Sequence, residues 1–301
     1  MKRLLIAGAT GLVGQEIVKQ CHDQNIAVNY LSTSKSKLEN KTNYKGFYWN
    51  PKLGEIDSQC FNDVDVIINL AGSTIAKRWT DSYKEEIKKS RVDALQLLYK
   101  AIDNESVPIK HLISASAIGV YPDSLTHYYD EDFKDFDNRF LSDVVRSWEK
   151  EANRFKKLNI KVSKIRIGIV LSNKGGALPQ LVKPIKLFAG SALGSGNQWQ
   201  SWIHIKDLAA LFLFVMQNKL EGKFNGVAPN AVTQKELVKD IAEAFQRPII
   251  LPAVPGFMLK LILGEMSALV LESQRVSSKK IERLGYKFKY YHLKPALEDL
   301  L

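Results

Sequence analysis

Residues 4–14 read LLIAGATGLVG, the most informative segment of the 301-residue chain for its fold. Its apolar start predicts a buried strand, and the glycines that follow at every third position predict a tight turn into a helix. Gly8 lets the chain turn off the strand, Gly11 leaves room for a pyrophosphate to approach backbone N–H groups, and Gly14 lets the helix pack against the strand. We therefore predict a dinucleotide-binding turn, against the alternative of a chance glycine turn.

Strands and helices alternate beyond this turn. Apolar runs predict strands at 27–31, 64–70, 111–114 and 162–167, and helical periodicity predicts helices near 12–24, 80–103, 139–158 and 205–217. Such alternation is typical of an open parallel sheet with helices on both faces. After Leu171 the pattern breaks into glycine-rich and proline-spaced pieces, and Thr233 with Glu236 predicts a capping box at a further helix.

This pattern predicts an α/β protein with two parts. The larger part is a Rossmann-type doubly wound parallel sheet made of residues 1–170, to which residues 200–228 return. The smaller part is a C-terminal α/β substrate domain made of residues 171–199 and 229–301.

Composition narrows the class of protein. The net charge of +11 comes from lysines scattered over predicted helix faces beside acids, with no basic tract interleaved with aromatics, so we expect no nucleic-acid partner. Two cysteines, Cys21 and Cys60, form neither a disulfide framework nor a metal cluster, which favours a reducing cytoplasm and no metal. Lys260 and Glu265 interrupt the apolar stretch 254–271, which predicts a buried or partner-facing helix rather than a membrane span. The sequence is compatible with a homodimer.

In an open α/β sheet, ligands bind beyond the carboxyl ends of the strands. Residues at these positions, with the glycine turn, form the predicted cofactor-binding set: Gly8, Thr10, Gly11, Leu12, Val13, Gly14, Ser32, Thr33, Lys35, Leu70, Ala71, Gly72, Ser114 and Arg166. No acid follows Leu31 to accept bonds from ribose hydroxyls, which favours NADP over NAD, with Ser32, Thr33 and Lys35 at the 2′-phosphate. One of Asp63 and Asp65 is expected to face the adenine.

The chain resembles the extended short-chain dehydrogenase/reductase family. The resemblance is carried by Gly8-x-x-Gly11-x-x-Gly14, Asn69-Leu70-Ala71-Gly72, Ser114-Ala115-Ser116 and Trp202-Ile203-His204-Ile205-Lys206-Asp207. More narrowly, the chain is similar to the atypical NAD(P)-dependent epimerase family protein branch. The motifs of that branch are Arg78-Trp79-Thr80, Ser90-Arg91, Trp148-Glu149, Gly175-Gly176-Ala177-Leu178, Gly194-Ser195-Gly196 with Trp199 and Trp202, and Leu263-Gly264-Glu265.

The resemblance implies a Tyr-x-x-x-Lys pair that this chain does not show. In the family, the tyrosine transfers a proton and the lysine lowers its pKa, with a helix glutamate four residues past the lysine. Anchoring the helix on Glu149 places Leu141 and Val145 at these positions, and neither side chain can transfer a proton. No Tyr-x-x-x-Lys occurs between residues 115 and 160.

Ser116 and Tyr121 are therefore the candidate catalytic residues. Ser116 matches the family's strand-end serine that hydrogen-bonds a substrate oxygen, although such a serine also commonly caps backbone groups. Tyr121 is expected beside the nicotinamide, where packing is the alternative role. Tyr128, Tyr129 and His204 are the remaining acid–base candidates.

The segment after Gly194 is expected to line a substrate pocket. Its predicted members are Gln198, Trp199, Trp202 and His204. Gln200 stands where nucleotide-sugar enzymes of the family carry a diphosphate-binding arginine, so a smaller polar ligand is favoured. The alternatives are a loop ordered by tryptophan packing and a core histidine.

Two functions follow from this reading of the sequence. The first is an NADP-dependent oxidoreductase or epimerase acting on a small polar metabolite. The second is a non-catalytic NADP-dependent sensor or scaffold for a protein partner.

Overall fold

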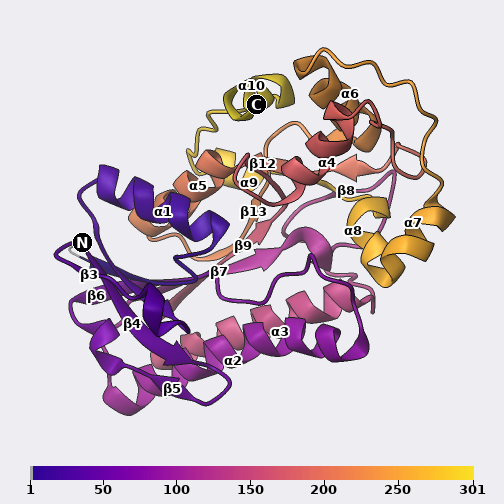
Figure 1. The fold of residues 1–301 in the computed structure, drawn as a ribbon. Coiled ribbons are helices and arrows are strands. Elements are labelled where there is room, and N and C mark those ends of the chain that lie inside the picture. Colours follow the sequence, from indigo (N-terminus) through magenta and orange to yellow (C-terminus); the bar gives the residue numbers. More distant parts are fainter. Residues whose placement is uncertain (1–2) are drawn as a thin grey trace.

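Strand β1 (Arg3–Ala7) lies in the middle of a nine-stranded sheet in the computed structural model, which describes residues 3–301 (Figure 1). Along the sheet the strands follow the order β13-β9-β7-β6-β1-β2-β4-β3, and β5 pairs with β4. Their bounds are β2 Ala27–Ser32, β3 Asn40–Lys41, β4 Tyr44–Asn50, β5 Glu55–Ile56, β6 Val64–Asn69, β7 His111–Ala117, β9 Lys161–Ile167 and β13 Gly222–Gly226. The pairs from β13 to β4 are parallel, and β3 and β5 pair antiparallel with β4.

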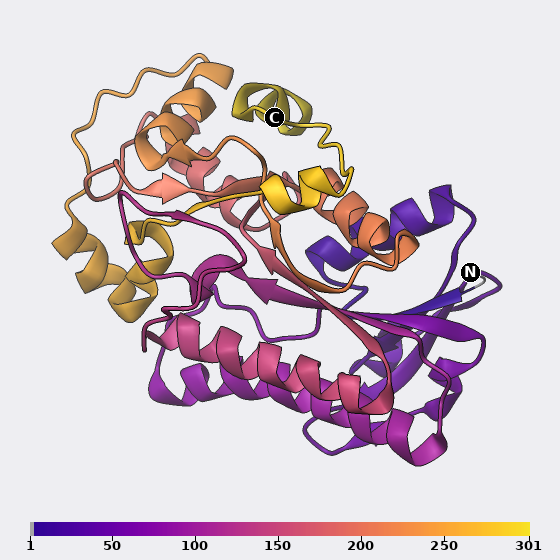
Figure 2. The same ribbon diagram turned by 180° about the vertical axis from the view of Figure 1, so that it is seen from behind.

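Helices cover both faces of this sheet, as the alternation predicts (Figures 1 and 2). Helices α1 (Leu12–Asp23) and α5 (Ile205–Gln217) pack together on one face, and α2 (Asp81–Glu105) and α3 (Phe140–Arg154) on the other. Leu4, Leu5 and Ile6 of β1 are fully buried between these layers. The central strands are apolar without alternation because both of their faces are covered.

The expected strands and helices are all present, and one excursion of the chain was not expected. Strands β3, β4 and β5 fall between two predicted strands, where no strand was predicted. The sequence of β4, YKGFYWN, is aromatic and polar rather than aliphatic, and six of its seven residues are only half-buried. Because it lies near the edge of the sheet, it does not carry the continuous apolar run that marks a central strand.

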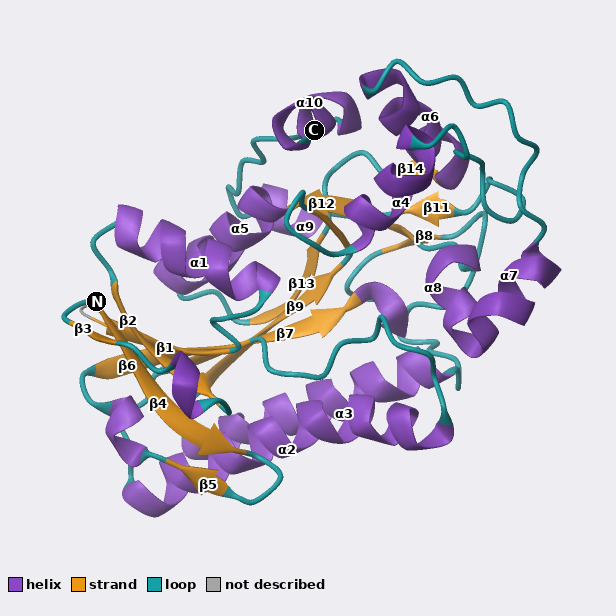
Figure 3. Cartoon of the chain, in the orientation of Figure 1, coloured by secondary structure: helices purple, strands orange, loops and turns teal. Residues whose placement is uncertain are grey.

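The remaining elements gather above the β9–β13 end of the sheet (Figure 3). The helices are α4 Ala177–Lys186, α6 Gln234–Ala244, α7 Gly256–Leu263, α8 Ala268–Leu271, α9 Lys279–Arg283 and α10 Leu293–Leu300. The short strands pair as β8 (Tyr128–Tyr129) with β15 (Arg275–Val276), β10 (Ile169–Leu171) with β12 (Trp202–His204), and β11 (Trp199–Gln200) with β14 (Val232–Thr233). The 3-10 turns are η1 Lys35–Lys37, η2 Ser58–Phe61, η3 Ile118–Val120, η4 Phe155–Leu158 and η5 Gly264–Ser267.

Two large clusters of buried side chains divide the interior. One fills both faces of the main sheet, and the other joins α4, α6 and α10 around Trp202. Ile281, Tyr286 and Phe288, from a segment predicted to belong to the smaller part, pack on the sheet cluster. Helix α6 begins at the predicted capping box, in which the side chains of Thr233 and Glu236 each bond the other's backbone N–H. Within residues 3–301, no helix combines the length and hydropathy that a membrane crossing needs.

Candidate functional site

The glycine turn brings the start of α1 against the end of β1. Gly8 has a φ of 90°, a backbone conformation that favours glycine, and its carbonyl oxygen accepts a hydrogen bond from Gly11 N at 3.1 Å. A Cβ on Gly14 would lie 2.2 Å from Gly8 O, so only glycine fits at this position of the helix. Gly11 is the N-cap of α1 and has no side chain to cover the first N–H groups. The helix start is therefore open to an anion.

A cavity of about 490 Å³ lies beside this turn, at the carboxyl end of β2, and is named here the β2 cavity. The predicted cofactor residues that line it are Gly8, Thr10, Ser32, Thr33, Ala71 and Gly72. Asn50 and Pro51, at the end of β4, also line it and were missed because β4 was not predicted. The signal for them was present, since an Asn-Pro step after an aromatic stretch is a turn signal.

Two lysines, Lys37 and Lys52, line the β2 cavity, whereas the predicted Lys35 does not. The Lys35 ammonium lies 4.9 Å from the centre of the Tyr48 ring. Successive side chains in the single 3-10 turn η1 point about 120° apart, so Lys35 and Lys37 face different directions. Lys52 is paired with Glu86 at 2.7 Å, which leaves Lys37 as the lysine available to a ligand.

Other predicted cofactor residues lie away from the β2 cavity. The Ser114 hydroxyl is fully buried and donates to the carbonyl oxygen of Ala115. Asp63 and Asp65 lie at the amino end of β6, whereas the glycine turn lies at the carboxyl ends of the parallel strands. Asp65 pairs with Lys110 at 2.8 Å. The expectation that one of these two aspartates faces the adenine is therefore wrong.

A second cavity, of about 170 Å³, lies at the carboxyl ends of β7 and β9 and is named here the α3 cavity. Helix α3 forms one wall, and both Leu141 and Val145 line it. Gly119, which also lines the cavity, packs against Leu141, since a Cβ on Gly119 would be 3.3 Å from Leu141 Cβ. Leu141 and Val145 are the two positions at which the resemblance, anchored on Glu149, predicts the family's proton-transferring pair. Among the described residues, no tyrosine or lysine lines this cavity.

Ser116 and Tyr121, the predicted catalytic residues, lie behind the cavity wall in a buried polar network. The Ser116 hydroxyl donates to Glu149 Oε1 at 2.7 Å, and Arg166 binds the same carboxylate through Nε (2.8 Å) and Nη2 (3.0 Å). Arg166 Nη1 donates to the Tyr121 hydroxyl at 3.0 Å, which in turn donates to Asn225 Oδ1 at 2.8 Å.

The electrostatics of this network are those of a buried ion pair. Burial opposes ionisation of Glu149, but the hydrogen bonds and charge of Arg166 outweigh it and hold the pKa of Glu149 below its ordinary value. Burial raises the pKa of Tyr121 to about 12. Arg166, predicted to bind the cofactor, is fully buried and committed to Glu149. Neither Ser116 nor Tyr121 touches the α3 cavity, so the geometry gives proton transfer by these two side chains no support.

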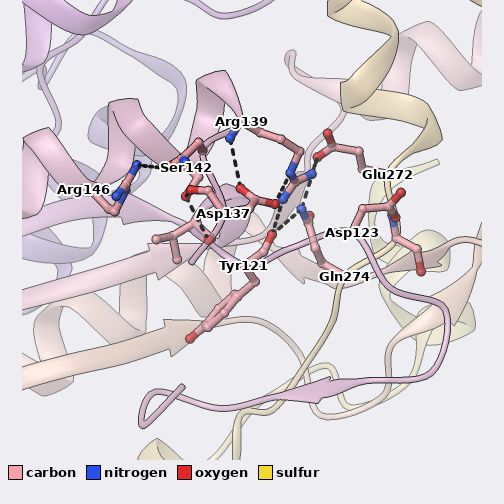
Figure 4. A network of polar contacts seen from close by, with 11 residues as sticks. Tyr121, Asp123, Asp137, Arg139, Ser142, Arg146, Glu272 and Gln274 are labelled. Atoms are coloured by element: carbon pink, nitrogen blue, oxygen red, sulfur yellow. Dashed lines mark hydrogen bonds and ion pairs between the residues drawn. The ribbon is translucent and has the colours of Figure 1, made fainter. Parts of the chain in front are cut away.

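A second arginine holds the opposite wall in place. Figure 4 shows Arg139, just before α3, between the carboxylates of Asp137 and Glu272. Its Nη2 donates to the carbonyl oxygen of Tyr121 at 2.7 Å, which also accepts from Gln274 Nε2 at 3.1 Å. Glu272 and Gln274 line the α3 cavity, so this cluster joins the end of β7 to a wall from the C-terminal part of the chain.

Of the predicted substrate residues, only Trp199 lines the α3 cavity. Gln198 is buried and its amide donates to the carbonyl oxygens of Leu193 and Val270. Trp202 is fully buried, and its Nε1 donates to the carbonyl oxygen of Asn230 at 2.8 Å. These two side chains hold an ordered loop, which was the alternative interpretation.

His204 is a core histidine rather than a ligand-binding one. It is fully buried, stacks on Tyr290 with ring centres 3.9 Å apart, and accepts from the backbone N–H of Lys206 as the N-cap of α5. Its Nε2 lies 3.2 Å from the Asp299 carboxylate. Burial lowers the pKa of His204 to about 4. Two other acid–base candidates, Tyr128 and Tyr129, form β8 and do not line the cavity.

Comparison with protein families gives two matches. The profile of the NAD dependent epimerase/dehydratase family matches residues 4–227, and a domain of unknown function (DUF1731) matches residues 254–300. An epimerase family protein of Staphylococcus haemolyticus is 40% identical over 303 residues, which cover 100% of this chain and 99% of the relative. A second, from Staphylococcus aureus strain MRSA252, is 40% identical over 306 residues, with the same coverage.

Two solved structures match almost the whole length of this chain. The crystal structure of the human epimerase family protein SDR39U1 with NADPH matches with a TM-score of 0.86 and 29% identity, covering 99% of this chain and 98% of that one. A nucleoside-diphosphate sugar epimerase from Corynebacterium glutamicum matches with a TM-score of 0.78 and 29% identity, over 98% of this chain and 57% of that one.

Proposed function

Because the chain belongs to the NAD dependent epimerase/dehydratase family, we propose that it binds NADP across the glycine turn and acts as an oxidoreductase or epimerase on a small polar metabolite. The proposal rests on one observation, the pair of cavities that lie at the carboxyl ends of the parallel strands, one lined by Gly72 and the other by its neighbour Arg91. The β2 cavity suits the adenosine half of the cofactor, and the α3 cavity suits the nicotinamide and the substrate.

The glycine turn supports the fit of a dinucleotide. Gly11 leaves the first N–H groups of α1 uncovered, and the close approach of Gly14 to Gly8 holds the helix start at the cavity mouth. A pyrophosphate there would accept backbone hydrogen bonds and gain from the helix dipole. The bound nicotinamide would supply hydride transfer, and the chain's residues would hold and orient it.

The choice of NADP rests on the end of β2. Ser32, Thr33 and Ser34 bring hydroxyls and N–H groups but no carboxylate, and Lys37 is the nearby cation. The acids of the β2 cavity, Glu86 and Asp93, come from α2. A 2′-phosphate would therefore find donors at β2, where an NAD-binding site would offer an acceptor. The human relative crystallised with NADPH is consistent with this choice.

For the reaction, we propose the α3 cavity as the site and assign Ser116 and Tyr121 to positioning. Their hydroxyls hold Glu149 and Arg166, which fix α3 against the ends of β7 and β9. Gln200 and Gln274 bring side-chain amides to the cavity wall. Their Nε2 groups donate within the protein, so the amide oxygens are the groups that can accept a hydrogen bond from a polar substrate.

Fluorescence titration with NADPH and NADH tests the cofactor assignment. We expect NADPH to bind about tenfold more tightly, since a charge-assisted contact to the 2′-phosphate is lost with NADH. Equal affinities, or tighter NADH binding, would contradict the assignment. Turnover is then sought by incubating the NADPH-loaded protein with a metabolite extract and following the nicotinamide absorbance.

The second candidate, a non-catalytic NADP-dependent sensor, is favoured by the apolar walls of the α3 cavity. Leu141, Val144 and Val145 offer no group that transfers a proton. Tight NADPH binding without turnover of any fraction of the extract would support this candidate over the enzyme.

A further inference from the structure

Arg91 of α2 reaches into the boundary between the two cavities. Its side chain lines the α3 cavity and lies against Gly72, which lines the β2 cavity. A Cβ on Gly72 would come within 3.0 Å of Arg91 Cγ and 3.1 Å of Cζ. The glycine at the end of β6 therefore makes room for a guanidinium at this place.

The guanidinium has fixed partners along one edge only. Its Nη1 donates to the carbonyl oxygens of Ser73 (3.2 Å) and Ile87 (2.8 Å), and its carbon lies 5.1 Å from the centre of the Trp148 ring. Nε and Nη2 donate to no residue of the described chain, and neither belongs to the fully buried polar atoms without a partner. These two nitrogens form the edge that binds a carboxylate in bidentate fashion.

Arg91 also has no counter-ion, unlike the other arginines around the cavity. Arg166 is paired with Glu149, and Arg139 with Asp137 and Glu272. No carboxylate of residues 3–301 lies within ion-pair distance of Arg91. Burial lowers the pKa of Arg91 to about 10, so the group is still a cation at neutral pH. A partly buried cation without a counter-ion is stabilised by an anion that meets its open edge.

We propose that the Nε–Nη2 edge of Arg91 binds the carboxylate of the substrate, so that the metabolite of this site is a small organic acid. This inference rests on the proposed function, because it places the reacting part of that acid beside the nicotinamide. The apolar side chains of Leu141 and Val145 would contact the hydrocarbon part of the acid, and the 170 Å³ volume limits its size.

One other anion could meet the same edge, the pyrophosphate of the cofactor. A substrate carboxylate and a cofactor phosphate both present oxyanions to Arg91, but they differ in whether acid binding or NADPH affinity depends on this residue. A substrate carboxylate makes the binding of organic acids depend on Arg91 while cofactor affinity does not. A cofactor phosphate makes NADPH affinity itself depend on Arg91.

The test uses pairs of an acid and its neutral amide, butyrate with butyramide and phenylacetate with phenylacetamide, on NADPH-loaded protein. Phenylglyoxal modification of Arg91, read by mass spectrometry of its peptide, reports access to the guanidinium in the wild-type chain. We expect at least one acid to protect Arg91, and its amide to protect about tenfold less, since only the acid forms the charge-assisted pair. Equal effects of acid and amide, or no effect of any acid, would overturn the proposal.

Variants separate the two sources of the anion. R91Q removes the charge, R91K keeps it without the bidentate edge, and R146Q removes an exposed arginine of α3 as the matched control. We expect acid binding, followed by tryptophan fluorescence, to fall in R91Q, to fall less in R91K and to persist in R146Q, with NADPH affinity unchanged in all three. A loss of NADPH affinity in R91Q without a change in acid binding would overturn the proposal in favour of a cofactor phosphate.

Repeating the acid-protection and variant experiments without NADPH distinguishes a failure of this inference from a failure of the proposed function. If the wild-type chain fails to bind NADPH but acids still protect Arg91, the proposed function fails and the organic-acid site stands. If NADPH binds and no acid discriminates between wild type and R91Q, the proposed function stands and the organic-acid site fails. Circular dichroism of each variant confirms that its fold is intact.

Discussion

Single side chains around the two cavities divide into those that hold the wall and those that face a ligand. Ser116, Glu149 and Arg166 share one buried cluster behind the α3 cavity. Lys37 and Arg91 face the cavities with charge that no acid of the described chain neutralises at close range. Ser116, Glu149 and Arg166 therefore serve structure here, and Lys37 and Arg91 are cations that can meet a ligand.

Lys37 is expected to carry the preference for NADPH. Lys37→Ala removes the ammonium beside the β2 cavity and should weaken NADPH about tenfold while leaving NADH unchanged, because only NADPH has the 2′-phosphate. Parallel fluorescence titrations measure both constants. Lys35→Ala is the matched control two residues away and should leave both affinities unchanged. A larger loss of NADPH affinity in Lys35→Ala than in Lys37→Ala would support the sequence-based prediction that Lys35 contacts the 2′-phosphate.

Glu149 is expected to be essential to stability. Glu149→Gln leaves Arg166 buried without its carboxylate and should cost about 3 kcal/mol of unfolding free energy, measured by urea denaturation. The exposed Glu243→Gln, which also breaks a lysine pair, is the control and should change little. Because the pKa of Glu149 is lowered in the fold, its contribution is present above the ordinary carboxyl pKa and is lost as the pH falls through the lowered value.

Whole elements are held together by polar residues at their ends. His204 caps α5 and reaches Asp299 of α10, while Asp207 in the first turn of α5 accepts from the N–H groups of Lys289 and Tyr290. Arg139 likewise links the start of α3 to the segment before β15. These contacts fix helices that are distant in sequence around the same end of the sheet.

His204 is expected to make stability depend on pH. Its pKa falls from 6.5 to about 4 on folding, so between these values the unfolded chain binds a proton that the folded chain does not. Stability should therefore decrease as the pH falls through this window, by up to about 3 kcal/mol from this residue. His204→Asn keeps an N-cap acceptor and removes the titration.

Urea denaturation at several pH values compares this variant with the wild type. His111, whose pKa burial also lowers to about 4, acts in the same window, so the difference between the two proteins isolates His204. Identical pH profiles for wild type and His204→Asn would show that His204 does not titrate on unfolding.

The two cavities draw their walls from most of the chain. The β2 cavity is built from residues between Gly8 and Ala94, and the α3 cavity from residues between Ile75 and Gln274. A dinucleotide that spans both would contact the start of the sheet and the C-terminal segment at once. Binding should therefore stabilise the molecule as a unit.

NADPH is expected to raise the thermal midpoint of unfolding in a single transition. At a hundred times its Kd, a ligand adds about 2.7 kcal/mol, which corresponds to about 4 °C for a chain of this length. Differential scanning fluorimetry with increasing NADPH measures the shift. Gly11→Val places a branched side chain where the pyrophosphate must approach and should remove the shift while keeping the fold. An unchanged shift in that variant would reduce the glycine turn to a structural feature.

The glycine turn and the alternating layers could be predicted from the sequence because each is a local pattern of apolar spacing, glycine and caps, and the resemblance to the family was carried by short motifs in a fixed order. The resemblance to the family, anchored on Glu149, singled out Leu141 and Val145, and both side chains line the α3 cavity. The apolar pattern missed β4, whose half-buried edge position leaves no aliphatic run to read.

The roles of the polar residues depend on contacts between segments that are distant in the sequence. In the sequence nothing shows that Ser116, Tyr121 and Arg166 have partners. In the structure they form hydrogen bonds or an ion pair with Glu149 and Asn225, which lie on other elements. Arg91 is the reverse case, a residue of an ordinary helix whose charge is left open because no acid of the described chain comes near it. Whether a polar side chain is free for a ligand depends on its neighbours in space, and the packing of distant segments sets those neighbours.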